Sequence, residues 1–255
     1  MDLVSSYLIK RKNKYIFLIP IFTFLPVSIK FFPILGILPL CFINIFIFRK
    51  ERSLFYIILL TSIFAIIFQI SDLKNTLLTV KDYSFATGIQ TFGFLSLYQD
   101  IHLKSITVIF IFLKIFLIVG TSINTYWGFL KKLKSPKNNF ILINFANTQI
   151  GLFFMLNITL TYFAFSNYDY RMIFAIGMIP FFISIWEYIP KKIFKISKKL
   201  IPYFFIFIGF QKYLITNLDT TSSYISDILI QPYLIGFTIG IISFLIFNKK
   251  IKFIS

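Results

Sequence analysis

Apolar residues occur along this chain in long, nearly uninterrupted runs, separated by short segments rich in lysine, arginine, asparagine and serine. One crossing of a bilayer's hydrocarbon core by an α-helix needs about 17–25 mostly apolar residues. Helices satisfy their own backbone hydrogen bonds in lipid, so runs of this length predict membrane-spanning helices. We expect eight spans, at residues 15–29, 31–48, 53–70, 105–123, 139–165, 172–189, 200–217 and 228–247.

The first two runs allow a second interpretation, in which they form one long segment kinked at its prolines. Only Lys30 separates them, and Pro20, Pro26 and Pro33 lie within or beside them. The distribution of charge favours two spans, because lysine and arginine accumulate on the cytoplasmic side of membrane proteins. With eight spans, most basic residues fall on one side and most acidic residues on the other. The basic segments are the N-terminus, residues 49–52, 131–137 and 191–199, and the C-terminus.

The sequence therefore predicts an all-α, polytopic transmembrane helical bundle with both termini in the cytoplasm. Residues 1–255 are expected to form a single integral membrane domain, with one long outside loop at residues 71–104. This loop contains an apolar stretch that either lies in the interface or re-enters the membrane. The first apolar run follows a basic segment without a small-residue cleavage site, so we expect a retained signal anchor.

Composition supports this fold class. Hydrophobic residues make up 58% of the chain and charged residues 14%, with a mean hydropathy of +0.84. Soluble domains are about 45–50% apolar and about 25% charged, so a soluble enzyme is excluded, and disorder requires lower hydrophobicity still. The abundance of Ile, Phe, Lys and Asn favours a bacterial source. The expected location is the bacterial cytoplasmic (inner) membrane, with membrane lipids as partners.

Several chemistries are excluded by the residues available. The single histidine and single cysteine cannot supply a zinc site, and no glycine-rich phosphate-binding loop is present, so no metal and no cofactor are expected. The net charge of +17 has its explanation in the basic cytoplasmic segments, which meet anionic lipid headgroups. Nucleic acid is therefore not an expected partner.

Two features inside the expected spans are candidates for function. Lys114 lies at the middle of span 105–123, where a cation faces a helix bundle, a wet cavity or an anionic partner. A structural ion pair or a misplaced span boundary is the alternative. In span 139–165, Asn144, Asn147 and Thr148 share a helix face that either lines a substrate cavity or forms interhelical hydrogen bonds.

The outer turn at residues 166–171 joins the fifth and sixth spans and gathers polar side chains at the membrane surface. Arg171 has the planar guanidinium that binds a lipid phosphate or diphosphate, and Asp169 can orient it or bind sugar hydroxyls. Tyr168 and Tyr170 either stack on a sugar ring or anchor the turn in the interface. From the residue types alone, a structural turn explains the segment as well as a binding site does.

A resemblance favours the binding site. The sequence NYDYRMIF at residues 167–174, followed by Pro180, resembles a signature of bacterial integral membrane proteins of polysaccharide biosynthesis. Those proteins are similar to C-type (GT-C) glycosyltransferases, which use polyprenyl-phosphate sugars on the outer leaflet. The likeness covers mainly residues 140–247, the C-terminal half of such an enzyme, with a looser echo at 83–94. It implies a polyprenyl-phosphate-linked sugar as ligand, with Asp169 and Arg171 as the motif's acid and cation.

The chain departs from that family in its first outside loop, where such transferases carry a catalytic acid. Here that loop is essentially Lys30, so the catalytic residue is unknown. The weak candidates for a base lie in the next loop and are Asp72, Asp82, Asp100 and His102. Either one of them is the base, or the chain matches only the later half of a longer protein.

Three functions follow from these features. The first is assembly of cell-surface polysaccharide on polyprenyl-linked sugars, either as a membrane glycosyltransferase or as a polymerase-like enzyme. The second is a non-catalytic membrane subunit or truncated half of a transferase, which would need a partner membrane subunit. The third is a transporter or flippase, whose path Lys114 and the polar face around Asn144 would line.

Overall fold

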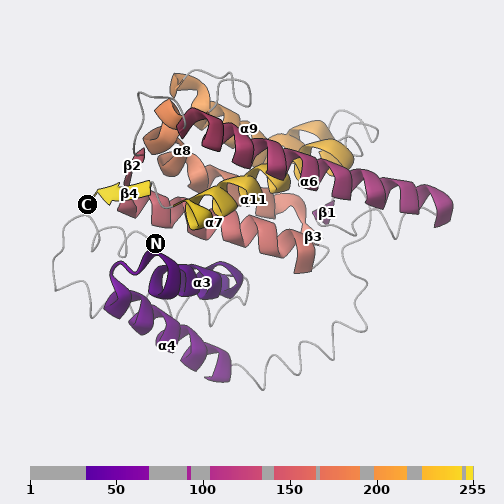
Figure 1. The fold of residues 1–255 in the computed structure, drawn as a ribbon. Helices are drawn as coiled ribbons and strands as arrows, with labels where there is room; N and C mark the ends of the chain where they lie inside the picture. Colours follow the sequence, from indigo (N-terminus) through magenta and orange to yellow (C-terminus); the bar gives the residue numbers. More distant parts are fainter. Residues whose placement is uncertain are drawn as a thin grey trace.

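The computed structural model describes residues 33–68, 91–92, 104–133, 141–164, 167–189, 198–216, 226–248 and 251–254. These residues are predominantly helical, so the all-α character predicted from the sequence is confirmed (Figure 1). The expected span 15–29 and most of loop 71–104 lie outside the described residues. The α-helices are α3 (Pro33–Phe42), α4 (Arg52–Phe68), α6 (Lys104–Leu133), α7 (Phe145–Ala164), α8 (Ile179–Ile185), α9 (Ile201–Thr216) and α11 (Gln231–Phe247).

Tighter and wider turns extend several of these helices. The π-helices are η2 (Ile43–Phe48) and η6 (Ser226–Ile230), and the 3₁₀-helices are η3 (Asp169–Met178), η4 (Trp186–Tyr188) and η5 (Lys198–Leu200). Four short strands within the described ranges form two pairs. They are β1 (Thr91–Phe92), β2 (Ile141–Asn144), β3 (Asn167–Tyr168) and β4 (Ile251–Ile254).

Each expected span within the described residues coincides with a helical segment, but two differ from expectation. Helix α6 continues past residue 123 to Leu133. The segment expected as span 139–165 begins with strand β2, and helix α7 starts only at Phe145. Among the described residues, two helices are long and apolar enough to cross a membrane, Val108–Leu133 and Ile228–Phe247.

Helices α6 and α11 run parallel in close contact because α11 presents glycines to α6. A Cβ on Gly236 would meet Thr121 and the backbone oxygen of Ile118, 2.5 Å away, and one on Gly240 would lie 2.6 Å from the backbone oxygen of Ser122. From Gly236 to Gly240 the chain advances four residues along α11, and the residues that they approach on α6 also advance by four, from Ile118 to Ser122. The two helices therefore run in the same direction. Small residues allow helix backbones to approach this closely.

Helix α7 lies between α3 and α8 and runs antiparallel to both. Gly36 of α3 faces Asn157, while Asn44, further along the chain, hydrogen-bonds Gln149, which comes earlier in α7. On another side, Gly151 of α7 contacts Phe181, and Gly177 contacts Phe154. With 20 residues, α7 is about 30 Å long, close to the thickness of a hydrocarbon core.

The two strand pairs lie at opposite ends of α7, since β2 precedes the helix and β3 follows it (Figure 1). At one end, β1 pairs antiparallel with β3, with Thr91 opposite Tyr168 and Phe92 opposite Asn167. At the other end, β2 pairs in parallel with β4, from Ile141 opposite Ile251 to Asn144 opposite Ile254. We call these the β1–β3 end and the β2–β4 end.

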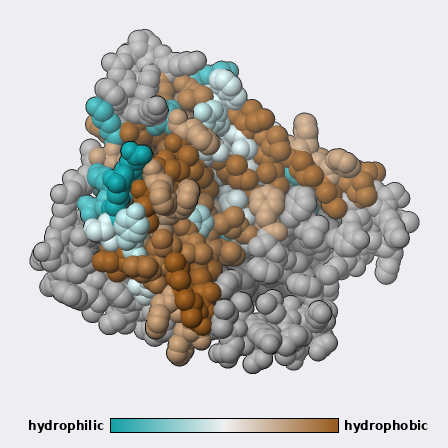
Figure 2. All heavy atoms as spheres, turned by 60° about the horizontal axis from the view of Figure 1, so that its bottom comes forward, coloured by the Kyte–Doolittle hydropathy of each residue, from teal (hydrophilic) through white to brown (hydrophobic). Residues whose placement is uncertain are grey.

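Large apolar side chains are abundant both in the core and on the surface. Helix α11 is mostly buried, whereas α6 exposes a long apolar row in which Phe116 is 74% exposed. Figure 2 shows a face on which hydrophobic residues form a broad band, with hydrophilic residues gathered mainly at one side of it. Other exposed members of the α6 row are Val108, Ile109, Phe112, Val119 and Ile123.

Candidate functional site

Lys114 is buried although α6 exposes a long apolar row. Its side chain is 1% exposed, while its neighbours Leu113 and Ile115 on α6 are exposed. It lies ten residues after Lys104, which corresponds to about 15 Å along the helix axis. Gly236 of α11 approaches α6 at Ile118. Lys114 lies about one turn before Ile118 on α6, and because the two helices are parallel it lies near the start of α11. The π-helix η6, which precedes α11, also packs against α6.

The fully buried Gln231 is the first residue of α11 and belongs to this region. A buried amine from α6 and a buried amide from α11 therefore occupy this part of the interior. The structure thus buries Lys114, and its position in a membrane span and its binding role stay predictions.

The polar residues singled out at the start of span 139–165 belong to the cap and first turn of α7. The Oδ1 atom of Asn144 accepts a hydrogen bond of 2.9 Å from the backbone N–H of Asn147, the pattern of an N-cap. The Thr148 hydroxyl donates to the backbone oxygen of Asn144 at 2.8 Å. These bonds are local to the helix, and a cavity-lining role for Asn144, Asn147 and Thr148 stays a prediction.

A different polar set lines the contact between α3–η2 and α7. The side chain of Asn44 donates to Gln149 Oε1 and, at 2.9 Å, to the backbone oxygen of Leu40. Further along α7, Asn157 faces Gly36. Asn44, Gln149 and Asn157 are all at least 98% buried. We call these three residues the amide row.

The sequence interpretation missed the amide row. A usable signal was present, because Asn44 is an amide in an otherwise apolar run, while Gln149 and Asn157 are eight residues apart and so share a broad helix face.

The face of α7 toward α11 is polar too, but its groups are paired. The hydroxyls of Thr159 and Thr238 lie 2.9 Å apart, and Thr238 also donates to the backbone oxygen of Ile235 at 2.8 Å. This is hydrogen bonding between two buried side chains of neighbouring helices.

The structure shows where the backbone of the outer turn, residues 167–171, lies. Tyr168 lies in β3 opposite Thr91, and Asp169, Tyr170 and Arg171 form the first turn of η3, which packs against α7 and α9. The pairing of β1 with β3 thus joins the turn to the segment around Thr91, within the stretch 83–94 that carries the looser echo of the same family. The side chains of these four residues lie outside the described part of the structure, as do Asp72, Asp82, Asp100 and His102.

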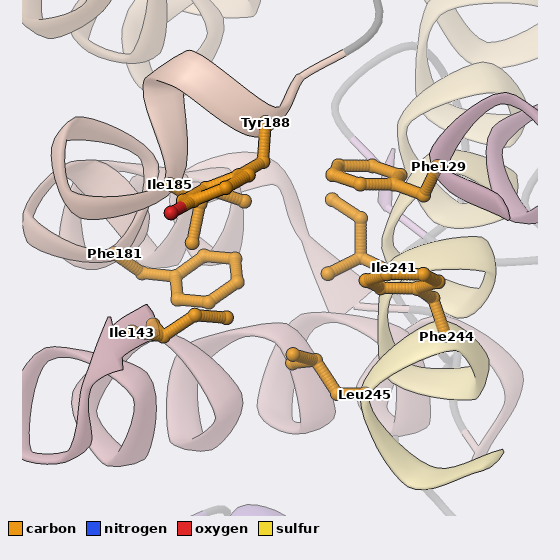
Figure 3. Close-up of a pocket in the computed structure, with 8 residues that line it drawn as sticks. All are labelled: Phe129, Ile143, Phe181, Ile185, Tyr188, Ile241, Phe244 and Leu245. Carbon is orange, nitrogen blue, oxygen red and sulfur yellow. The ribbon is translucent and has the colours of Figure 1, made fainter. Parts of the chain in front are cut away.

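A small apolar cavity of about 10 Å³ lies near the β2–β4 end (Figure 3). In this view Phe181 and Tyr188 face Phe129 and Phe244 across it, and the Tyr188 hydroxyl points away. The remaining lining residues are Ile143, Ile185, Ile241 and Leu245. Its volume holds about one water molecule, so it is no substrate pocket.

Within the described ranges, no three His, Cys, Asp or Glu side chains cluster in a way that could hold a metal ion. No protein-family model, curated protein or solved structure matches the chain.

Proposed function

We propose that this protein is integral to the bacterial inner membrane, crosses it eight times with both termini in the cytoplasm, and takes part in assembling cell-surface polysaccharide. Its ligand in this proposal is a polyprenyl-phosphate-linked sugar, bound at the outer leaflet beside the turn at residues 166–171.

The directions of the helices support alternating crossings from α3 onward, and they are the same whether residues 15–48 form one span or two. Alternating crossings require spans two and five, and five and six, to be antiparallel, while spans four and eight must be parallel. The pairs α3–α7, α7–α8 and α6–α11 satisfy these three conditions. Helix direction is independent of the charge distribution from which the topology was predicted.

The β2–β4 end supports the cytoplasmic assignment, because segments expected inside the cell make contact there. Lys50 Nζ donates to the backbone oxygen of Phe253 at 3.2 Å, and Lys132 Nζ donates to that of Ile189 at 3.3 Å. These bonds connect the first basic loop with the C-terminus, and the second basic loop with the end of the sixth span.

The exposed apolar surface supports a lipid environment. Apart from Lys114, which is buried, the outer part of α6 presents mainly large apolar side chains, and α4 exposes a similar row near its end. Contiguous apolar surface of this kind is rare on soluble monomers, whereas lipid chains cover it without cost. The residues exposed on α4 are Leu60, Ile63, Phe64, Ile67 and Phe68.

The pairing of β1 with β3 is the observation that carries the functional proposal. It brings together the two stretches that resemble polysaccharide-biosynthesis proteins, at the end of α7 opposite the basic segments. In this proposal Arg171 binds the lipid phosphate, Asp169 orients Arg171 or binds sugar hydroxyls, and Lys114 supplies a second cation at mid-depth. Tyr168 and Tyr170 stack on the sugar.

Topology is tested by labelling single cysteines in intact cells. In a Cys41→Ala background, Ser166→Cys is expected to react with a membrane-impermeant maleimide, and Ser135→Cys only after the membrane is permeabilised. Labelling of Ser135→Cys in intact cells, with Ser166→Cys protected, would contradict the topology.

Ligand binding is tested by native mass spectrometry of the purified protein with polyprenyl phosphate and a polyprenyl-phosphate sugar. Specific adducts are expected on the wild type and should be lost in Arg171→Ala. A conservative Arg171→Lys variant, which keeps the charge but not the planar fork, is expected to retain weak binding. Equal, weak adducts on all three proteins would leave the subunit or the transporter as the better hypothesis.

A further inference from the structure

The amide row contains three buried polar atoms that are left without a hydrogen-bond partner. Within the part of the chain that the structure describes, Asn44 Oδ1, Gln149 Nε2 and Asn157 Oδ1 have no donor or acceptor to meet them. A buried polar group left unmatched costs about 1–3 kcal/mol. Three such atoms along one helix contact require an explanation, and a hydrogen-bonding molecule between the helices would supply the missing bonds.

The types of these atoms define the chemistry of that molecule. Two oxygens need a donor and one amide nitrogen needs an acceptor, and a hydroxyl group can serve as either. Gln149 and Asn157 are eight residues apart on α7, which is about 12 Å along the axis. The row therefore offers separate contacts to successive hydroxyl groups and not one coordination sphere for a cation.

The helix opposite α7 is built irregularly at this place. Pro39 lies inside α3, and the helix widens into the π-helix η2 one residue before Asn44. Asn44 donates to the backbone oxygen of Leu40, close to the point where the helical hydrogen-bond pattern changes. Such π-segments are frequent at functional sites, and a proline inside a helix removes one of its backbone hydrogen bonds.

We propose that the amide row is a binding seam for hydroxyl groups between α3–η2 and α7. The hydroxyls belong either to ordered water or to the sugar of the lipid-linked ligand. The sugar source rests on the proposed function, whereas the water source does not. Asn157 lies seven residues before the end of α7, about 10 Å from the β1–β3 end, within reach of a sugar that enters there.

Two measurements distinguish the sources. The first is a cryo-EM structure of the ligand-free wild type at a resolution that shows ordered water. The second is a native mass-spectrometry titration that gives the preference for a polyprenyl-phosphate sugar over polyprenyl phosphate, for the wild type, Gln149→Leu and Asn157→Leu. Thr159→Val is the matched control, because it alters a paired hydroxyl on the other face of the same helix.

If sugar hydroxyls fill the seam, the preference for the sugar-bearing lipid falls by up to about tenfold in Gln149→Leu and Asn157→Leu and stays unchanged in Thr159→Val. If water fills it, density appears within hydrogen-bond distance of at least one of the three atoms, and the preference does not change. Density in the wild-type structure shows whether water occupies the seam even if a leucine variant fails to fold.

The proposal that the amide row binds hydroxyl groups would be overturned by two results together. These are no water density near any of the three atoms and an unchanged preference for the sugar-bearing lipid in both leucine variants. If the wild type binds neither lipid, the proposed function fails. The water density alone then shows whether the amide row binds hydroxyl groups.

Discussion

The α6–α11 contact and the α3–α7 contact both depend on glycine, but they differ in the polar side chains that lie opposite the glycines. Between α6 and α11, Gly236 and Gly240 bring the backbones together, and Thr121 donates to the Leu117 oxygen of its own helix at 2.6 Å. Between α3 and α7, Gly36 creates a similar approach, yet the amides opposite it keep unmatched atoms. In our proposal the first contact is permanent packing, and the second admits hydroxyl groups of a further molecule.

The largest effect is expected from adding a methyl group to the α6–α11 contact. In Gly236→Ala the new Cβ meets Thr121 and lies 2.5 Å from the backbone oxygen of Ile118, which cannot move away without shifting the helix. Overpacking of this kind costs ~1–3 kcal/mol, so the melting temperature in detergent should fall clearly. The matched control is Gly120→Ala on α6, whose Cβ would meet nothing within 4 Å.

Gly120→Ala should leave stability unchanged or raise it by up to ~1 kcal/mol, since alanine favours helix more than glycine does. Equal destabilisation by both substitutions would refute the close α6–α11 contact.

A smaller loss is expected from the same change at the α3–α7 contact. In Gly36→Ala the new Cβ lies 2.5 Å from Asn157 Nδ2, at the end of a flexible side chain, and 2.9 Å from the backbone oxygen of Phe153. The amide can turn aside, so the melting temperature should fall less than in Gly236→Ala. A larger fall in Gly36→Ala would show that α3–α7 is the more rigid of the two contacts.

The Asn44–Gln149 bond should give a measurable coupling in a double-mutant cycle of Asn44→Leu and Gln149→Leu. Interhelical hydrogen bonds in membranes contribute ~0.6 kcal/mol on average and up to ~1.7 kcal/mol, so the double variant should lose less stability than the sum of the single variants. Chemical unfolding in detergent measures the four free energies. Strict additivity would indicate that the two amides do not interact.

The smallest effect is expected at the paired hydroxyls between α7 and α11. Thr159→Val removes one hydrogen bond and keeps the shape of the side chain, and Thr238 retains its bond to the Ile235 oxygen. A loss below ~1 kcal/mol in the same unfolding experiment is expected. A loss greater than that of Gly36→Ala would contradict the placing of this hydrogen bond as the smallest effect.

The sequence was sufficient to predict the helices, because an apolar run long enough for a membrane crossing has few other structures available. The burial of Lys114 follows from the same reasoning, since a cation cannot face lipid at that depth without large cost. The start of α7 could not be predicted, because strand β2 forms by pairing with residues 251–254, more than a hundred positions away.

That pairing explains why the sequence interpretation selected Asn144 and not Gln149. A helical wheel extended back through β2 includes Asn144 in the polar face, whereas in the structure this residue caps the helix. Which helix lies opposite each face of α7 is decided by packing, and a wheel drawn for one helix contains no information about its neighbours.

The central claim is that the β1–β3 end handles a lipid-linked sugar during assembly of surface polysaccharide. The most direct test is to delete the gene in the source bacterium, restore the wild type or Arg171→Ala from the same promoter, and quantify extracellular glycan at equal membrane levels of the two proteins. The account predicts that glycan returns with the wild type and not with Arg171→Ala. Normal glycan in cells that carry Arg171→Ala, or in the deletion strain itself, would contradict it.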